Sequence, residues 1–197
     1  MSDHKQETAM TEPLMVADHL ALDLLNTEAG VDALHVDFWN GADDVLRWLE
    51  RCGIDIGPLE NQAANDDLLG DARQLRTIAR ELVELRKAGE RGDPARLNRY
   101  LARMQSTPQL AWGEDGPLLL RRLPAPSPQQ ALGQVAESLA ELLAGGQFDY
   151  VRQCEHPDCV LWFYDRTKSH RRRLCSMALC GNRHKAAEFR KRGRTAA

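Results

Sequence analysis

The stretch CEHPDCVLWFYDRTKSHRRRLCSMALCGNRHK, residues 154–185, decides how the last quarter of the chain folds. It holds four of the five cysteines, three of the six histidines and seven Arg or Lys residues. The cysteines form two pairs with the spacing Cys154-x4-Cys159-x15-Cys175-x4-Cys180. Two short cysteine loops about 12–20 residues apart are typical of a structural zinc site. The sequence therefore predicts one zinc ion bound by these four cysteines.

The spacing alone leaves other uses of the four thiols open. Disulfides would fit an oxidising compartment, an iron–sulfur cluster also takes four thiolates, and free cysteines pack as small hydrophobic side chains. A histidine could replace one cysteine, since His156, His170 and His184 lie in the same stretch. Zinc is the leading prediction, because the two pairs complete a closed shell of four ligands, which is structural rather than catalytic.

The residues around the cysteines predict a small fold. Val160–Asp165 is rich in aromatic and branched residues and is predicted to be a strand, with a turn at 166–169 and a returning strand at 170–174. A helix is expected from about Gly181, where glycine would permit a tight turn with amides free to bond cysteine sulfurs and Asn182 would brace the turn. Cysteine knuckle, hairpin, knuckle and helix follow the order of a treble-clef-like zinc finger.

Side chains along the first predicted strand alternate between two faces. Trp162 and Tyr164 alternate with Leu161 and Phe163. One face is expected to pack inside the finger, and the other to dock on the helical domain rather than stack on nucleic-acid bases.

Charge is divided unevenly along the chain. Residues 149–197 carry 12 Lys and Arg against five Asp and Glu, a balance of +7, whereas residues 1–148 carry 14 against 24, a balance of −10. The net charge of −3 therefore hides an acidic body and a basic module, a distribution typical of proteins that bind nucleic acid or another polyanion. The chain is predicted to form two domains, 1–148 and 149–197.

The basic residues of the module are candidates for contacts with DNA, because Arg and Lys neutralise phosphates and release counterions. The alternative is a solvated surface on a small zinc domain. Arg183 and Arg190 share one side of the predicted helix and are the favoured pair for a single groove. The full set of candidates is Arg166, Lys168, Arg171, Arg172, Arg173, Arg183, Lys185 and Arg190.

Residues 1–148 are predicted to be mainly α-helical. Apolar residues recur at three- and four-residue spacing, and N-cap and glycine signals mark the helix ends. The predicted helices span 20–29, 40–53, 67–88, 93–104 and 127–145, and QLAWGEDGPLLLRRL (109–123) predicts a small β-hairpin. The expected fold class is mainly α, with a helical N-terminal domain and a C-terminal zinc finger.

Four polar residues near the first predicted helix allow two interpretations. Asp18, Asp23, Asn26 and Thr27 are either caps and solvated surface, or they line a pocket for a small-molecule effector or a partner. No nucleophile elbow, P-loop, dinucleotide glycine pattern or metalloprotease motif is present, so the sequence predicts no enzyme.

Hydropathy indicates where the protein works. No apolar run approaches the ~20 residues that cross a bilayer, and the first residues have no apolar stretch of the signal-peptide type. The sequence predicts a cytoplasmic protein without membrane contact, in a compartment where thiols stay reduced.

Three stretches resemble one known family. CSMALCGNRHKAAEFRKR (175–192) resembles the CGNR zinc-finger family, named for the letters at 180–183, and FYDRTKSHRRRLC (163–175) resembles its Asp-x-Ser/Thr and Arg-Arg pattern before the third cysteine. ALDLLNT (21–27) is similar to the opening of the helical ABATE domain that accompanies this finger. The resemblance implies a stress-responsive transcriptional regulator.

The leading functional prediction is thus a transcription regulator that binds double-stranded DNA through the basic finger. The helical domain is expected to supply effector sensing or homodimerisation. Two alternatives stay open, a zinc-stabilised adaptor that contacts an acidic protein and an RNA-binding module. Steep salt dependence with sequence preference would separate DNA binding from the adaptor, and a preference for single-stranded RNA would favour the third.

Overall fold

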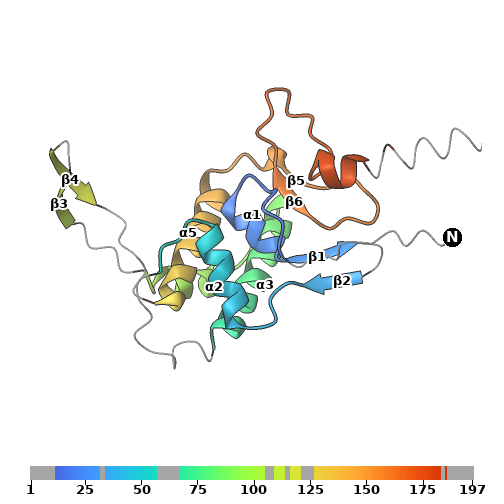
Figure 1. Ribbon diagram of the computed structural model, residues 1–197. Coiled ribbons are helices and arrows are strands. Elements are labelled where there is room, and N and C mark those ends of the chain that lie inside the picture. The colour runs from blue at the N-terminus through green and yellow to red at the C-terminus, as the bar shows by residue number, and fades with distance from the viewer. Residues whose placement is uncertain are drawn as a thin grey trace, which may run out of the picture.

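The chain folds into a helical N-terminal part and a C-terminal part built on a short hairpin (Figure 1). The computed structural model describes residues 12–31, 34–56, 67–104, 109–113, 116–120, 127–182 and 185. Its α-helices are α1 (Leu20–Leu25), α2 (Ala42–Arg51), α3 (Leu68–Lys87), α4 (Ala95–Leu101) and α5 (Pro128–Gly145). Its antiparallel strand pairs are β1 (Glu28–Val31) with β2 (Leu34–Asp37), β3 (Gln109–Gly113) with β4 (Gly116–Leu120), and β5 (Val151–Gln153) with β6 (Trp162–Tyr164). A 3₁₀-helix, η2 (Phe148–Tyr150), precedes β5, and a π-helix, η3 (Met177–Gly181), carries the last cysteine.

The predicted fold class is confirmed, with a mainly helical N-terminal part, a small hairpin at the predicted place and a C-terminal hairpin with four clustered cysteines. Local signals set several helix ends. The hydroxyl of Ser127 accepts the backbone N–H of Gln130 at the start of α5, and Pro128 occupies the first position. Gly53 and Gly89 follow α2 and α3 with φ of 73° and 78°, which glycine adopts without steric cost.

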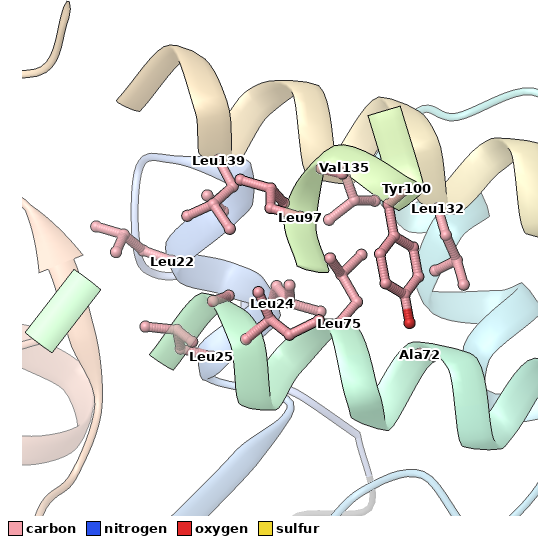
Figure 2. Close-up of a cluster of buried hydrophobic side chains, with 14 of the residues drawn as sticks. Leu22, Leu24, Leu25, Ala72, Leu75, Leu97, Tyr100, Leu132, Val135 and Leu139 are labelled. Carbon is pink, nitrogen blue, oxygen red and sulfur yellow. The ribbon is translucent and has the colours of Figure 1, made fainter. Parts of the chain in front are cut away.

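The five described α-helices each bury one face in the main core, and Figure 2 labels side chains from four of them. α1 packs on α3 and α5, and α4 packs on the same two helices. No helix among the described residues is both long and apolar enough to cross a membrane. The labelled core side chains are Leu22, Leu24 and Leu25 of α1, Ala72 and Leu75 of α3, Leu97 and Tyr100 of α4, and Leu132, Val135 and Leu139 of α5. Each of them is at most 3% exposed, so hydrophobic burial by these helices is the main stabilising contribution.

The helix predicted over 20–29 is wrong in its second half, because α1 has six residues and strand β1 begins at Glu28. Contacts with α3 decide this outcome. Arg76 is buried and donates to the Thr27 hydroxyl and to both carboxylate oxygens of Asp37, at 3.1, 2.9 and 2.8 Å. These bonds hold the β1–β2 hairpin against α3, and tertiary pairing of this kind overrides local helix propensity.

The hairpin predicted between the two cysteine pairs is wrong in its second strand. β6 pairs with β5, across the first cysteine pair, and residues 170–174 form no strand. Side chains already form hydrogen bonds with the backbone N–H and carbonyl of Arg172 that a second strand would need for pairing. The Asp165 carboxylate accepts the backbone N–H of Arg172 at 2.9 Å, and the Arg152 guanidinium donates to the carbonyl of the same residue at 3.3 Å.

The C-terminal hairpin packs into the helical part. Trp162 of β6 joins the core of the helices, whereas Leu161 and Phe163 pack with the four cysteines, which confirms that one face of this strand docks on the helical part. Asn26 holds the strand in place. Its Nδ2 donates to the Trp162 carbonyl at 2.9 Å, and its Oδ1 accepts the Trp162 N–H at 2.8 Å.

Three of the four polar residues near α1 are buried and bonded inside the protein, so they form neither a solvated surface nor the lining of a pocket. The capping interpretation holds in part, since Asn26 is the C-cap of α1 and the Thr27 hydroxyl donates to the Leu24 carbonyl at 2.7 Å. Asp23, Asn26 and Thr27 are at most 7% exposed. The Oδ1 atom of Asp23 accepts the backbone N–H groups of Val16 and Ala17, both at 3.0 Å. Asp23 therefore fixes the segment that precedes α1.

Replacing Asp23 with Asn is expected to change how stability depends on pH. Burial raises the pKa of Asp23 to about 6, although the N–H groups of Ala17 and Val16 lower it. Because this folded pKa lies above the unfolded value of about 4, the contribution of Asp23 to stability is complete below pH ~4. It is lost as pH rises through about 6, at a cost of up to about 3 kcal/mol.

Asparagine keeps an oxygen for both N–H groups and cannot ionise. Urea unfolding from about pH 4 to 8 should therefore show the variant gaining stability relative to the wild type as pH rises. A difference between the two proteins that is independent of pH would contradict this account of Asp23.

Candidate metal centre and basic loop

Four cysteines from separate segments meet beside the hairpin. Cys154 follows β5 and Cys159 precedes β6, so the pairing of these strands brings the first two together. Cys175 comes after residues 165–174, which we call the basic loop, and Cys180 lies in η3. The four sulfur atoms all lie within 4.8 Å of one another.

The distances between the sulfurs fit a tetrahedral metal shell. Four thiolates bound about 2.3 Å from a zinc ion lie about 3.8 Å apart. The Sγ of Cys175 lies 3.8 Å from that of Cys159 and 3.5 Å from that of Cys180. A disulfide needs about 2.05 Å, and all five cysteines are free. The four clustered cysteines are at most 8% exposed, so the site is closed to solvent.

Four thiols this close cannot all ionise without a cation. Contacts with the other three thiols, that of Cys159 first, lower the pKa of Cys154. Contacts with Cys154 and Cys159 raise the pKa of Cys175 and Cys180, because each further negative charge would face the first. The backbone N–H of Cys175 donates to Cys154 Sγ at 3.3 Å, which stabilises a thiolate there. A dication would neutralise the set, so the cluster is suited to hold a metal ion structurally.

The described histidines of this stretch do not join the sulfur cluster, and the group of ligating atoms found in the described residues consists of cysteines alone. The Nδ1 atom of His156 accepts the backbone N–H of Asp158 at 3.3 Å. The ring of His170 stacks on Tyr150 with 3.8 Å between centroids. His184 lies outside the described residues.

The glycine beside the last cysteine lies close to the Met177 side chain. A Cβ at Gly181 would lie 2.9 Å from the sulfur of Met177. The N–H of Gly181 donates to the Ser176 carbonyl at 2.9 Å, so the expectation that this glycine frees an amide for a cysteine sulfur is wrong. Asn182 braces the turn as predicted, since its Nδ2 donates to the Ala178 carbonyl at 3.3 Å.

The candidate nucleic-acid contacts differ in how the fold presents them. Arg172 directs its guanidinium at backbone carbonyls, and its side chain is 19% exposed. Arg173 pairs with Glu155 while 72% of its side chain stays exposed. Lys185 is exposed, whereas Arg183 and Arg190 lie outside the described residues. The exposed candidates on the basic loop are Arg166, Lys168, Arg171 and Arg173.

Two residues that shape the basic loop were not among the candidates. Asp165 is completely buried and bonded to the loop backbone, and Arg152 of β5 donates to two loop carbonyls. Asp165 had one signal in the sequence, the Asp-x-Ser/Thr pattern. Arg152 had none, because its role depends on strand pairing.

Two family models match the chain. The ABATE model, described as "Putative stress-induced transcription regulator", matches residues 18–146. The model of the CGNR zinc finger matches residues 150–193. A search of curated proteins found no match. The resemblance noted in the sequence is confirmed by both matches.

Proposed function

This chain belongs to the ABATE family and carries a CGNR zinc finger, and from that premise we propose that it regulates transcription by binding double-stranded DNA through the finger. The observation that carries the proposal is the basic loop, whose exposed cations lie next to the cysteine cluster. A balance of +7 over residues 149–197 against −10 over residues 1–148 supports phosphate binding by the finger alone.

The proposal includes one zinc ion held by Cys154, Cys159, Cys175 and Cys180. A closed shell of four thiolates leaves no position for water or substrate, so the metal would supply stability and no reaction chemistry. The proposed role is binding, and no residue is assigned a catalytic step. The protein would work in the cytoplasm, where its thiols stay reduced.

The salt dependence of DNA affinity is expected to report how many Lys and Arg side chains contact DNA phosphates. If the four exposed residues of the basic loop each engage one phosphate, log affinity for duplex DNA should fall against log salt with a slope near −3.6. Arg171→Ala should change the slope to about −2.7 and weaken binding to all sequences alike, as loss of one phosphate contact does. Fluorescence anisotropy with labelled duplexes between about 50 and 200 mM salt measures both quantities.

The matched control is Arg99→Ala, which removes the same charge from an exposed position on α4. It should leave the slope unchanged, and equal effects of the two variants would place the contact elsewhere. Tighter binding to single-stranded RNA would favour the RNA-binding alternative. Binding to an acidic protein without affinity for either nucleic acid would favour the adaptor.

The predicted helix residues remain part of the proposal. Arg183, Lys185 and Arg190 are proposed to contact DNA from the helix that the sequence predicts from about Gly181. If this helix enters the major groove, Arg183→Ala should relax the preference at one base position. Affinity measured over a set of operator variants on zinc-replete protein tests this, and an unchanged preference would remove Arg183 from the recognition surface.

The helical part is proposed to supply effector sensing or dimerisation. An open hollow of about 540 Å³ lies along α3 and is lined by apolar and charged groups. Sedimentation velocity tests the dimer, and protection of α3 amides from hydrogen exchange by an added ligand tests the hollow. Its lining residues are Thr77, Arg80, Glu81, Glu84, Leu85 and Ala88.

A further inference from the structure

A buried carboxylate ties both ends of the basic loop together. Asp165 is 0% exposed. Its Oδ1 accepts the N–H and the hydroxyl of Thr167 at 3.0 and 2.6 Å, and its Oδ2 accepts the N–H of Arg172 at 2.9 Å. Burial raises the pKa of Asp165, but the bonds from Thr167 and Arg172 outweigh it and hold the pKa below its ordinary value, so the carboxylate stays charged.

The middle of the loop is held in a conformation that needs support. His170 has a φ of 48°, in the left-handed region that residues other than glycine rarely adopt. Its ring stacks on Tyr150, and its carbonyl accepts a hydrogen bond from Arg152 at 2.8 Å. The backbone on both sides of Arg171 is therefore fixed by contacts that leave this side chain exposed.

The Arg172 side chain joins the loop to the cysteine cluster. Its Nε donates to the Leu174 carbonyl at 3.1 Å, and its Nη2 donates to the carbonyl of Cys175, one of the four clustered cysteines. The central guanidinium carbon, Cζ, lies over the ring of Phe163, 4.3 Å from its centroid. Phe163 itself packs with the cysteines, so Arg172 covers one side of the cluster.

The same guanidinium reaches the segment that precedes α1. Nη2 also donates to the Val16 carbonyl at 2.8 Å, and Nη1 pairs with Asp18 at 2.5 Å. Val16 packs against the cysteine cluster as well. These bonds use four of the five N–H donors of the guanidinium, and the Phe163 ring covers one of its faces. The paired N–H groups that would bind a phosphate therefore already donate inside the protein.

We infer that Arg172 is a positioning residue, which pins the basic loop to the cysteine cluster and to residues 16–18 so that Arg171 and Arg173 face outward. The identity of what the loop binds rests on the proposed function. The positioning of the loop by Arg172 does not depend on it, because it follows from contacts within the protein. The triplet 171–173 thus divides its work between one internal arginine and two surface arginines.

Charge-conserving variants in zinc-replete full-length protein test whether Arg172 positions the loop or contacts a phosphate. Arg172→Lys keeps the charge but cannot reach the same set of acceptors, since an ammonium has no planar fork. The amides of Thr167 and Arg172 should then exchange with deuterium faster by roughly tenfold or more, as follows from losing bonds to a charged group. The melting temperature and the DNA affinity should fall. Arg171→Lys should leave exchange and melting nearly unchanged, and Arg99→Lys, at an exposed position on α4, should leave exchange, melting and affinity nearly unchanged.

A second variant decides the case if Arg172→Lys fails to fold or loses zinc. Asp18→Asn alters only the partner in the segment before α1, and it should raise exchange of the same loop amides to a smaller extent. Unchanged exchange in Arg172→Lys, or in Asp18→Asn where the first variant does not fold, would overturn the inference. If the wild type binds no DNA at any salt concentration, the proposed function fails, while the exchange data still decide the role of Arg172.

Discussion

A Cys180→Ser protein is expected to lose its zinc and the fold of the finger together. Binding of a structural zinc supplies about 10–16 kcal/mol of apparent free energy in small zinc domains, which is comparable to or larger than the whole stability of an ordinary domain. The four cysteines share a hydrophobic cluster with Leu14, Val16, Ala29 and Phe38. Unfolding of the finger should therefore also expose the segment before α1 and the β1–β2 hairpin.

Elemental analysis of the purified protein and thermal unfolding followed by circular dichroism measure this result. Cys52→Ser is the control, because Cys52 lies at the end of α2, outside the sulfur cluster. It should retain one zinc per chain. A wild-type protein without zinc, or a Cys180→Ser protein with unchanged zinc, would remove this assignment.

Trp162→Ala is expected to destabilise the whole protein by about 3–5 kcal/mol, the usual cost of truncating a buried aromatic side chain. Trp162 is 7% exposed and belongs to the main core formed by the five described α-helices, although it lies in the C-terminal hairpin. For a chain of this length, the melting temperature should fall by about 10 °C. The bonds between Asn26 and the Trp162 backbone do not involve the indole, so the hairpin keeps its partner.

Urea unfolding measures the loss, and zinc content should stay at one per chain because Trp162 packs away from the sulfurs. Met177→Ala is the control. Its side chain is 60% exposed, so the change should be within about 0.5 kcal/mol. Stability unchanged by Trp162→Ala would show that the hairpin contributes nothing to the helical core.

The same contacts bear on the predicted division of the chain into the domains 1–148 and 149–197. A fragment of that length lacks Val151 and Trp162, which are buried in the helical core, and leaves both hydrogen-bonding groups of Asn26 without their partner. An unsatisfied buried amide costs about 1–3 kcal/mol. If the fragment folds, we expect it to be clearly less stable than the full chain.

Local patterns in the sequence were sufficient for several elements. The spacing of Cys154, Cys159, Cys175 and Cys180 predicted the sulfur cluster, because each pair is closed by a loop of a few residues. Ser127 with Pro128 marked the start of α5, and Gly-Glu-Asp-Gly marked the β3–β4 hairpin. Each of these signals lies within a few residues of the structure it specifies.

The charge count could locate the basic loop but could not tell its arginines apart. Arg171, Arg172 and Arg173 are identical as letters, yet the first and third are exposed and the second is bonded to Val16 and Asp18. The direction of each side chain depends on the left-handed turn at His170 and on the Asp165 carboxylate. A local sequence pattern does not contain that information.

The sequence by itself determined the cysteine cluster, the helical composition of residues 1–148 and the charge contrast between the two ends of the chain. The tertiary structure alone decided that β5 pairs with β6 and that Arg76 of α3 bonds to Asp37 at the end of β2. It also decided that the Asn26 side chain bonds to the backbone of Trp162, 136 residues away. The physical reason is range. Caps, turns and cysteine loops act between near neighbours, whereas buried polar groups find partners only after the core has brought distant segments together.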